Sequence, residues 1–478
     1  MVNTCIKHPR SLKTFFLTEM WERYGFYVVQ TLLALYLATH LGWKDKKVYE
    51  LVGSLTALTY ISPVIGGWIA DHLIGQRAAI ISGGIILFLS YITLGLISSD
   101  SKLCLTLAGV AVGSGLLKPN ISSLLGNEYP DNSPIRENGF TIFYMGITVG
   151  IILGTTLPSY FSEHFGWSTA FISASVGMIL ALFSFVHGVY FYKITDYTDH
   201  GFDFKKIALA LVLAGFIWVS NYYILTFPSL AQGVFIAVVL ACVFYFYLCI
   251  KNESKKQSKL TIIIGLLCLI SIMFWAFYFQ MFLSLTLFIS RAVEPTILGL
   301  QFPPPYYVGI QSIGMIIFGI FLCKNKKKLD ISEQTKRTGN KFFLSMCCML
   351  ISYLLITLIC HIDYAKGLIP VLMLIPTYLI ISLAELLISP VGLAAVTLLS
   401  NRKKVSTMIG IFFVSLGIGG FLSGKLANIT SIPDANLSFS ELKIHYTNSF
   451  TNLLLILACA TLLSLVINLI IKRLMSDK

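Results

Sequence analysis

The stretch TFFLTEMWERYGFYVVQTLLALYLATH, residues 14–40, is long and apolar enough to cross a lipid bilayer, yet it carries charges in its middle. Glu19, Glu22 and Arg23 are spaced i, i+3 and i+4, so on a helix they share one face. Tyr27 and Gln30 extend that face by one turn each. Because ionisable side chains are costly in lipid, we expect this polar stripe to look into a bundle of helices.

Apolar runs of similar length recur along the rest of the chain. Of its 478 residues, 56% are hydrophobic and only 12% are charged, against about 25% charged in soluble proteins. The apolar runs are continuous and roughly 20 residues long, which favours membrane-spanning helices over the alternating strands of a barrel. The sequence therefore predicts an all-α membrane protein with helices at 14–40, 50–70, 78–97, 103–124, 139–161, 169–192, 207–227, 230–250, 260–289, 308–323, 342–361, 368–400, 407–428 and 448–471.

Short polar linkers, such as those at 127–138 and 324–341, set the expected orientation. With a cytoplasmic N-terminus, about 25 of the 35 Lys and Arg residues fall in cytoplasmic loops, and both termini lie in the cytoplasm. The pair of helices at 207–250 contains no charged residue and indicates an inserted hairpin. We therefore expect three segments, a six-helix bundle at 1–200, a hairpin at 201–258 and a second six-helix bundle at 259–478, in which the two bundles are the halves of a rocking transporter.

Two further charges lie deep in apolar runs, Lys118 in GSGLLKPNISS and Glu385 in LIISLAELLISP. One interpretation is that these charges form ion pairs whose only role is to hold helices together. A buried ion pair is, however, weak evidence for stability. The three acids and two bases inside the membrane leave one carboxylate without a protein partner. A proton or a cationic amine would supply the missing charge, so a zwitterionic solute matches a cavity with Lys118 on one wall and Glu385 on another.

Other function classes find little support. The net charge is +13, but the basic residues do not form a stripe interleaved with aromatic residues, so we expect no binding of nucleic acid. We expect the basic residues to orient the helices in the membrane instead. The ten cysteines include no CxxC pair and are interpreted as core residues, with no metal site. A membrane enzyme or receptor would need a reactive constellation at the interface or a sizeable soluble loop, and we expect no catalytic residues.

The charged segments resemble motifs of the proton-coupled oligopeptide transporter family, within the major facilitator superfamily. EMWERYGFY at 19–27 is similar to the family's ExxERFxYY motif on helix 1, and FTIFYMGITVG at 140–150 is similar to FYxxINxG. Lys118 and Glu385 fall on the family's lysine of helix 4 and glutamate of helix 10. Ordered matches run from residue 8 to about 425, and they also include GGWIADHLIGQR at 66–77, GSGLLKPNISSLL at 113–125, FWAFYFQ at 274–280 and SLAELLISPVGL at 382–393.

The resemblance implies a major facilitator fold, with two six-helix bundles and an inserted hairpin, and a monomeric symporter of the bacterial cytoplasmic (inner) membrane. It would import di- and tripeptides by alternating access, with a proton as coupling ion and no cofactor. Glu19 and Glu22 would move the proton, and Arg23 and Lys118 would be their switching partners. Lys118 would also hold the peptide carboxylate, and Glu385 the amino terminus. Further substrate-binding residues would be Tyr27, Gln30, Tyr60, Tyr144, Thr148, Gln280, Gln311, Ser389 and Phe412, and Asp71 and Arg77 would belong to a conformational loop.

The sequence departs from the family pattern at several of these positions. Gln30 and Phe279 stand where many members have an arginine and a carboxylate that can pair at the outer gate. Thr148 and Gln311 replace two asparagines, and Phe412 replaces a tryptophan. Because these changes alter the amides available to a peptide, the alternative is the same fold carrying an amino-acid derivative, a peptide-like drug or another organic anion.

Overall fold

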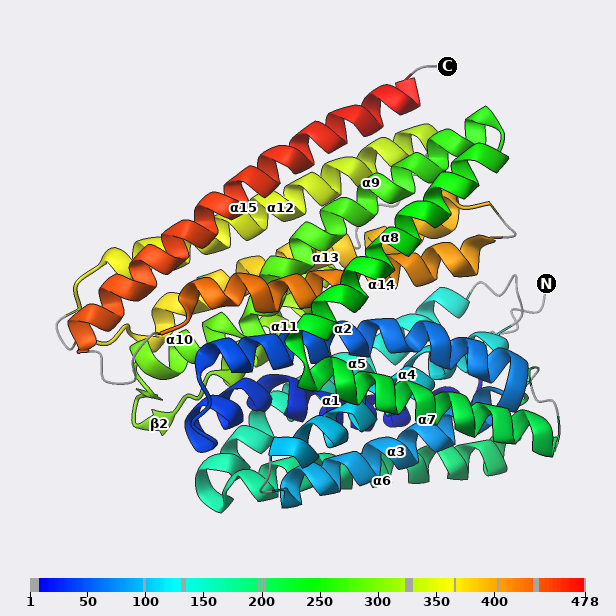
Figure 1. Cartoon of the computed structure of the whole chain (residues 1–478), viewed down its shortest axis with the longest axis horizontal. Coiled ribbons are helices and arrows are strands. Elements are labelled where there is room, and N and C mark those ends of the chain that lie inside the picture. Colours follow the sequence, from blue (N-terminus) through cyan, green and yellow to red (C-terminus); the bar gives the residue numbers. More distant parts are fainter. Residues whose placement is uncertain are drawn as a thin grey trace, which may run out of the picture. The chain divides into compact units, whose positions relative to one another are not determined.

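A computed structural model describes residues 8–97, 100–129, 135–196, 198, 201, 203–322, 330–364, 367–401, 404–432 and 438–476. These residues form helices and one small sheet (Figure 1). The elements are α1 (Leu12–Leu35), η1 (Tyr36–His40), α2 (Asp45–Ile69), η2 (Ala70–Ile74), α3 (Gln76–Leu96), α4 (Asp100–Asn127), α5 (Arg136–Phe165), α6 (Trp167–Tyr192), α7 (Phe204–Thr226), α8 (Pro228–Asn252), α9 (Lys255–Tyr278), η3 (Phe279–Phe282), α10 (Ser284–Ala292), β1 (Thr296–Ile297), β2 (Leu300–Gln301), α11 (Pro305–Leu322), α12 (Ile331–His361), η4 (Val371–Leu374), α13 (Ile375–Leu399), α14 (Val405–Ala427), η6 (Asn428–Thr430) and α15 (Phe439–Ser476).

The helices confirm the predicted fold class. Twelve helical segments of the described chain are long and apolar enough to cross a membrane, judged by length and composition. The two other predicted spans are also helical. One is α1, which carries Glu19, Glu22 and Arg23, and the other is α11, whose apolar part, Pro305–Phe321, is short. All fourteen predicted helices are therefore present.

Several helices extend beyond their apolar runs. Helix α12 begins at Ile331 rather than at residue 342, and α15 covers Phe439–Ser476 rather than 448–471. The added turns are polar, so hydropathy could not reveal them. The predicted linker at 324–341 is consequently wrong from residue 331 onward, while residues 324–329 lie outside the described part. Asp330 caps α12 by accepting a hydrogen bond from the Glu333 N–H at 2.8 Å.

The predicted helix 260–289 is broken in its second half. Helix α9 ends at Tyr278, a 3-10 turn η3 follows, and α10 starts at Ser284. The Gln280 side chain donates to the Ser423 carbonyl at 2.8 Å and accepts from the Ser284 hydroxyl at 2.6 Å. These bonds satisfy polar groups around the break, which is how non-helical backbone is tolerated at membrane depth.

The short hairpin of β1 and β2 was not predicted. Thr296 pairs with Gln301, and the two-residue turn uses Leu298 at φ 50° and Gly299 at φ 81°. Such a turn needs positive φ at both central residues, which glycine adopts readily and leucine does not. Gly299 was the one local signal for it.

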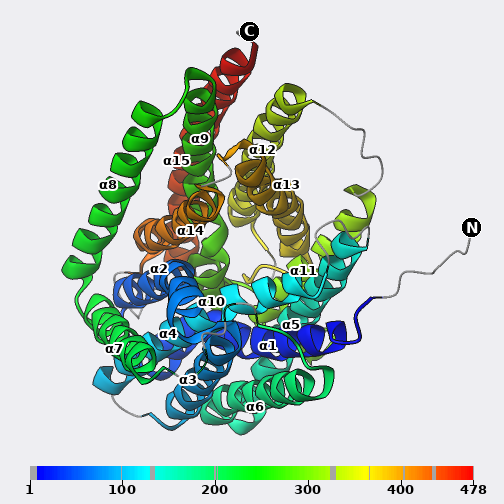
Figure 2. The same ribbon diagram turned by 90° about the vertical axis from the view of Figure 1, so that its right-hand side faces the viewer.

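Contacts divide the chain into two units, which are described separately. Unit 1 is Met1–Leu33 with Leu58–Phe227, and unit 2 is Ala34–Ala57 with Pro228–Lys478. In unit 1, α3 packs against α4 and α6, and in unit 2, α12 packs against α13 and α15 (Figures 1 and 2). The boundaries 1–200, 201–258 and 259–478 remain a prediction.

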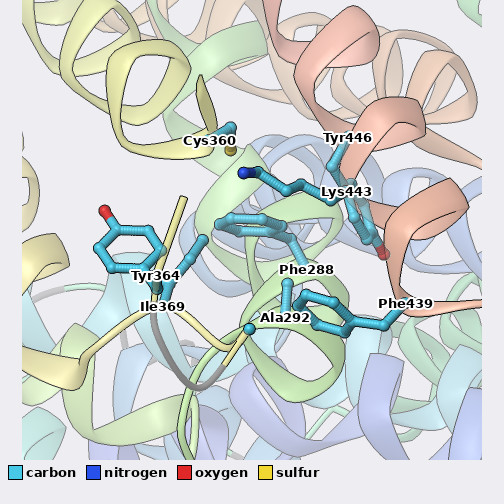
Figure 3. A pocket seen from close by; sticks show the side chains of 9 residues that line it. Phe288, Ala292, Cys360, Tyr364, Ile369, Phe439, Lys443 and Tyr446 are labelled. Atoms are coloured by element: carbon cyan, nitrogen blue, oxygen red, sulfur yellow. The ribbon is translucent and has the colours of Figure 1, made fainter. Parts of the chain in front are cut away.

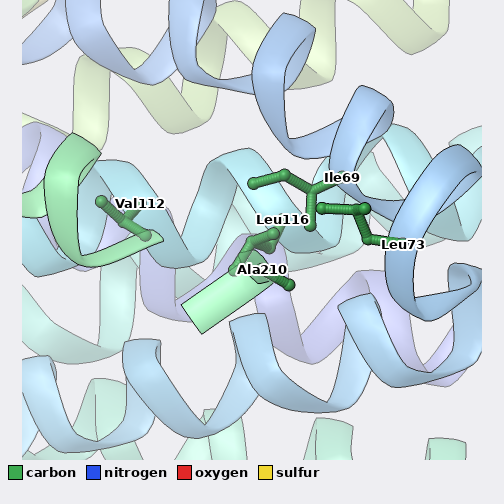
Figure 4. Packing of buried hydrophobic residues seen from close by; sticks show 5 residues of the cluster. All are labelled: Ile69, Leu73, Val112, Leu116 and Ala210. Atoms are coloured by element: carbon green, nitrogen blue, oxygen red, sulfur yellow. The ribbon is translucent and has the colours of Figure 1, made fainter. Parts of the chain in front are cut away.

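The two helices of the expected hairpin pack within different units. Helix α7 contacts α4 and η2, and Ala210 lies among Ile69, Leu73, Val112 and Leu116 (Figure 4). The indole N–H of Trp218 on α7 also donates to the Leu105 carbonyl of α4 at 2.9 Å. Helix α8 contacts α9 and α14. The hairpin therefore contributes one helix to the packing of each unit.

Three glycines on α5 let its backbone approach α1 closely in unit 1. A Cβ placed on Gly150 would lie 2.3 Å from the Met20 carbonyl oxygen, and one on Gly154 would lie 2.6 Å from the Tyr24 carbonyl oxygen. Gly146 makes the same kind of contact with the carbonyl of Phe16, at 2.8 Å. Small residues spaced by four are the usual means of close helix packing in membranes. This contact fixes the rotation of α1 and hence the direction of its polar stripe.

In unit 2 the first turns of α2 are tied to the second half of the chain. Arg291 at the end of α10 forms a two-pronged ion pair with Asp45, both N–O distances being 2.7 Å. The Ile432 N–H also donates to Asp45, at 3.1 Å. Two turns further along α2, Gly53 lies against Gly424 of α14, where an added Cβ would come within 2.8 Å of the Gly424 Cα. We call the segment Asp45–Ala57 and its partners the α2 seam.

Replacing Gly150 with alanine is expected to destabilise unit 1, because the new methyl group would overlap the α1 backbone. Overpacking of this kind costs about 1–3 kcal/mol. Thermal unfolding of the purified protein in detergent should show a lower Tm. Gly215→Ala on α7 is the matched control, because nothing lies within 4 Å of its Cβ position. An equal or higher Tm for Gly150→Ala than for the control would contradict the close packing.

Removing one partner of the Asp45–Arg291 pair should be more harmful than removing both. Asp45→Leu removes the counterion of Arg291 and leaves it the Tyr446 hydroxyl at 3.2 Å; breaking a buried pair in this way costs about 3–5 kcal/mol. The double variant Asp45→Leu, Arg291→Met should regain a large part of the lost Tm. Glu50→Gln is the control, since its ion pair with Lys425 is longer, 3.6 Å, and more exposed. Additive losses in the double variant would show that the two residues do not depend on each other.

Candidate functional site

The charged trio on α1 forms a single cluster in unit 1. The Arg23 Nε lies 3.2 Å from a Glu19 carboxylate oxygen and also hydrogen-bonds Glu22. The exposed fractions of Glu19, Glu22 and Arg23 are 3%, 0% and 4%. The guanidinium carbon of Arg23 also lies 5.1 Å from the centroid of the Phe26 ring. The predicted shared face is therefore confirmed by geometry, and one guanidinium serves two buried carboxylates.

The pairing leaves part of each charged group unsatisfied. Among the described residues, Glu19 Oε2, Glu22 Oε1 and Arg23 Nη2 are buried and have no hydrogen-bond partner. Buried polar atoms without partners are costly, and those of ions more than others. Each member of the trio therefore keeps a buried polar atom that could still accept or donate a hydrogen bond.

Lys118 lies near the trio but is not ion-paired in this structure. Its ammonium is 4.4 Å from the centroid of the Tyr60 ring on α2 and 5.7 Å from that of Phe26 on α1. Within the described residues, no carboxylate lies within ion-pair distance of it. Two aromatic faces hold the cation, which leaves its donors available for an anion.

Glu385 forms the corresponding centre in unit 2. One carboxylate oxygen accepts hydrogen bonds from the Tyr278 hydroxyl at 2.8 Å and the Gln311 amide at 2.6 Å. The three side chains come from α13, α9 and α11. Ser382 ties α13 to α11 by donating to the Gln311 carbonyl at 2.7 Å. Both partners of Glu385 are neutral donors, so its charge is oriented but not cancelled.

The other predicted binding residues differ in how exposed their side chains are. Tyr144 is 55% exposed, Tyr27, Tyr60, Thr148 and Ser389 are half-buried, and Gln30 is buried. Gln280 and Phe412 are buried and engaged in packing: Gln280 bridges the break before α10, and the Phe412 ring lies against Gly392. In this conformation those two side chains hold helices together, and their part in binding remains a prediction.

The predicted conformational loop is anchored by an aspartate that sequence reasoning missed. Gly75, at φ 80°, turns the chain between η2 and α3. Asp196, after α6, accepts a hydrogen bond from the Arg77 N–H at 2.8 Å, and the Arg77 Nε lies 3.9 Å from it. Asp196 therefore caps α3 and pairs with Arg77, while Asp71 is exposed. A second missed residue is Tyr278, which lies in the FWAFYFQ motif but was not assigned a role.

Unit 2 contains a cavity that is too small to hold a peptide. It lies among the ends of α10, α12 and α15, with Lys443 extending toward Cys360 (Figure 3). Its free volume of about 10 Å³ accommodates roughly one water molecule. At its rim, the hydrogen bond from Lys443 lowers the pKa of the exposed Asp363 carboxyl below its ordinary value.

The two centres have complementary chemistry. Unit 1 offers an ammonium without a counterion and two carboxylates that share one guanidinium. Unit 2 offers a carboxylate held only by neutral donors. Among the described residues no cluster of three metal-ligating side chains occurs.

Comparisons with known proteins agree with this chemistry. The sequence profile of the POT family matches residues 77–443. Dipeptide and tripeptide permease A of Erwinia pyrifoliae is 30% identical over 450 residues, which cover 92% of this chain and 89% of the permease. The permease of the same name from Klebsiella pneumoniae is 30% identical over 437 residues, covering 90% of this chain and 85% of the permease.

Solved structures are similar over almost the whole chain. A bacterial homologue of the human drug peptide transporters PepT1 and PepT2 superposes with a TM-score of 0.85 at 25% identity, covering 97% of this chain and 99% of that one. A tetrameric PepTSo2 gives 0.84 at 26% identity, with coverage of 97% and 99%. A peptide transporter POT in complex with alafosfalin gives 0.82 at 25% identity, with coverage of 99% and 97%. The chain therefore belongs to the POT family, whose members are proton-dependent oligopeptide transporters and not enzymes.

Proposed function

We propose that the chain imports di- and tripeptides together with protons by alternating access. The observation that carries this proposal is a pair of charged groups that make no ion pair of their own within the described residues: Lys118 faces aromatic rings, and Glu385 accepts only neutral hydrogen bonds. A short peptide has a carboxylate for Lys118 and an ammonium for Glu385. The dipeptide and tripeptide permeases among the relatives support the same solute.

Proton coupling is assigned to the trio on α1. Glu19 and Glu22 compete for one guanidinium, so protonation of either carboxylate frees Arg23 for the other. With both glutamates ionised the trio carries a charge of −1, which Lys118 balances. A proton on the trio makes Lys118 the uncompensated charge and prepares it for the peptide carboxylate. Tyr27, Gln30, Tyr60, Tyr144, Thr148, Gln280, Gln311, Ser389 and Phe412 are proposed to line the binding site, and Asp71 and Arg77 to belong to the conformational loop.

The protein is proposed to work as a monomer in the bacterial inner membrane with both termini in the cytoplasm. In that orientation the α2 seam lies on the outer side. It joins a helix of the first half to α10 and α14 of the second half, so it has to open when the outer side opens. The pair Asp45–Arg291 would then act as the outer gate in place of the missing pair at Gln30 and Phe279.

A second candidate is the same mechanism with another solute. Gln311 and Thr148 stand where the family has asparagines. The Gln311 amide is engaged with Glu385, and the Thr148 hydroxyl donates to the Tyr144 carbonyl at 3.2 Å. Both positions therefore offer less to a peptide backbone than free asparagine amides would. Competition of labelled dialanine by amino-acid derivatives and peptide-like drugs separates this candidate from the first.

Proteoliposomes that contain the purified protein should accumulate labelled di- and trialanine when the outside is acidic. A protonophore should abolish accumulation, while exchange of labelled for unlabelled peptide should persist. Free alanine should not compete. If neither peptide accumulates or exchanges, and a solute from the competition panel does, the second candidate function replaces the first.

Glu385→Gln should weaken the recognition of a free amino terminus. The apparent affinity for dialanine should fall about tenfold or more, because a charged hydrogen bond of roughly 1.5–3 kcal/mol is lost. Competition by N-acetyl-dialanine should change little, because this ligand has no ammonium. Lys118→Gln is the matched variant and should instead erase the difference between dialanine and its C-terminal amide. The assignment fails if Glu385→Gln weakens both ligands equally.

A further inference from the structure

A buried tyrosine in unit 1 has no role in the site described so far. Tyr91 on α3 is fully buried, and its hydroxyl has no hydrogen-bond partner among the described residues. Its ring packs on Gly25 of α1, where an added Cβ would lie 2.9 Å from the ring Cε2 and 3.5 Å from Cζ. Gly25 comes three residues after Glu22, so it lies on the same side of α1.

Glu22 presents an unsatisfied oxygen in the same region. One of its oxygens bonds Arg23, while Oε1 is buried and accepts no hydrogen bond from the described residues. Through its contact with Gly25, the Tyr91 ring lies on the side of α1 that carries Glu22. A carboxylate oxygen without a donor and a phenol without an acceptor thus face one buried region, and each group alone would be costly.

A third unpartnered group lies on α4. Ser114 is fully buried, and its hydroxyl has no partner in the described part of the chain. It precedes Lys118 by four residues and so shares its face of α4, which is turned toward Phe26 of α1. A water molecule shared by the three groups would have the two to four partners that a buried water needs.

We propose that Tyr91 is a positioning residue for proton coupling, whose hydroxyl donates to Glu22 Oε1 either directly or through one water molecule also held by Ser114. This inference rests on the proposed function of Glu22. A hydrogen bond to the ionised carboxylate favours that form, so Tyr91 helps Glu22 to release its proton. The charged groups nearest to Glu22 are Arg23, which bonds it, and Glu19, which shares that guanidinium. Lys118 on α4 lies 5.7 Å from the Phe26 ring of α1, while Tyr27 and Tyr144 interact with Arg23 and Glu19 rather than with Glu22.

Tyr91→Phe keeps the ring and removes only the hydroxyl. Uptake of dialanine into proteoliposomes, measured against pH at constant gradient, should shift its midpoint upward by about one pH unit. Peptide exchange, which needs no net proton movement, should stay within twofold of the unmodified protein. Tyr24→Phe is the matched control: it removes a buried hydroxyl that bonds Ser173 at 2.8 Å and should leave the midpoint unchanged.

A second measurement separates this inference from the proposed function. The infrared carbonyl band of protonated Glu22, identified by its loss in Glu22→Gln, can be titrated in the purified protein without any transport. It should persist to higher pH in Tyr91→Phe than in the unmodified protein or in Tyr24→Phe. An unchanged titration in Tyr91→Phe overturns the role of Tyr91 even if transport is proton-driven. A shifted titration without proton-driven uptake would leave Tyr91 in place and remove the proposed function.

Discussion

The close approach of α1 to α5 is the constraint on which the chemistry of unit 1 depends. Gly150 and Gly154 bring the two backbones together, so α1 cannot rotate about its axis without a clash. That fixed rotation keeps Glu19, Glu22 and Arg23 buried in protein, where side chains can compensate the cost of removing charge from lipid and water. The trio is nevertheless under-satisfied, since one guanidinium serves two carboxylates. Rigid packing thus holds a charge arrangement that a proton can change at low cost.

In unit 2 the buried carboxylate of Glu385 is held by neutral donors rather than by a cation. Glu385 is kept in place by Tyr278 and Gln311, which orient the carboxylate without cancelling its charge. A cationic partner here would stabilise the side chain but would also compete with the ammonium of a ligand. The replacement of the family's asparagine by Gln311 fits this view, because the longer side chain reaches the carboxylate at 2.6 Å. The glutamine at this position therefore takes part in positioning Glu385.

The sequence was sufficient to predict the helices and the charged face of α1, because both follow from local spacing. Runs of about twenty apolar residues identify spans, and i, i+3, i+4 spacing identifies a face. Partners distant in sequence could not be predicted this way. Asp45 and Arg291 are 246 residues apart and each resembles an ordinary loop charge, while Asp196 gives no sign that it caps α3. The break at Gln280 and the polar turns that start α12 were also missed, since hydropathy reports burial in lipid and not the hydrogen bonds of the backbone.

The α2 seam ends in an ion pair between a carboxylate and an arginine. Gly53 and Gly424 bring α2 and α14 into backbone contact, and Asp45–Arg291 closes the end of the seam. An arginine keeps its charge throughout the physiological pH range, so Asp45 is the partner in this pair that can take up a proton. Gln30 and Phe279, which stand where the family can place its gate pair, are uncharged in this chain. Under the proposed function the trio on α1 takes up the proton, and Asp45 is a further carboxylate, held in the seam by Arg291. The ion pair Asp45–Arg291 and the charged trio on α1 are thus separate groups that belong to different units.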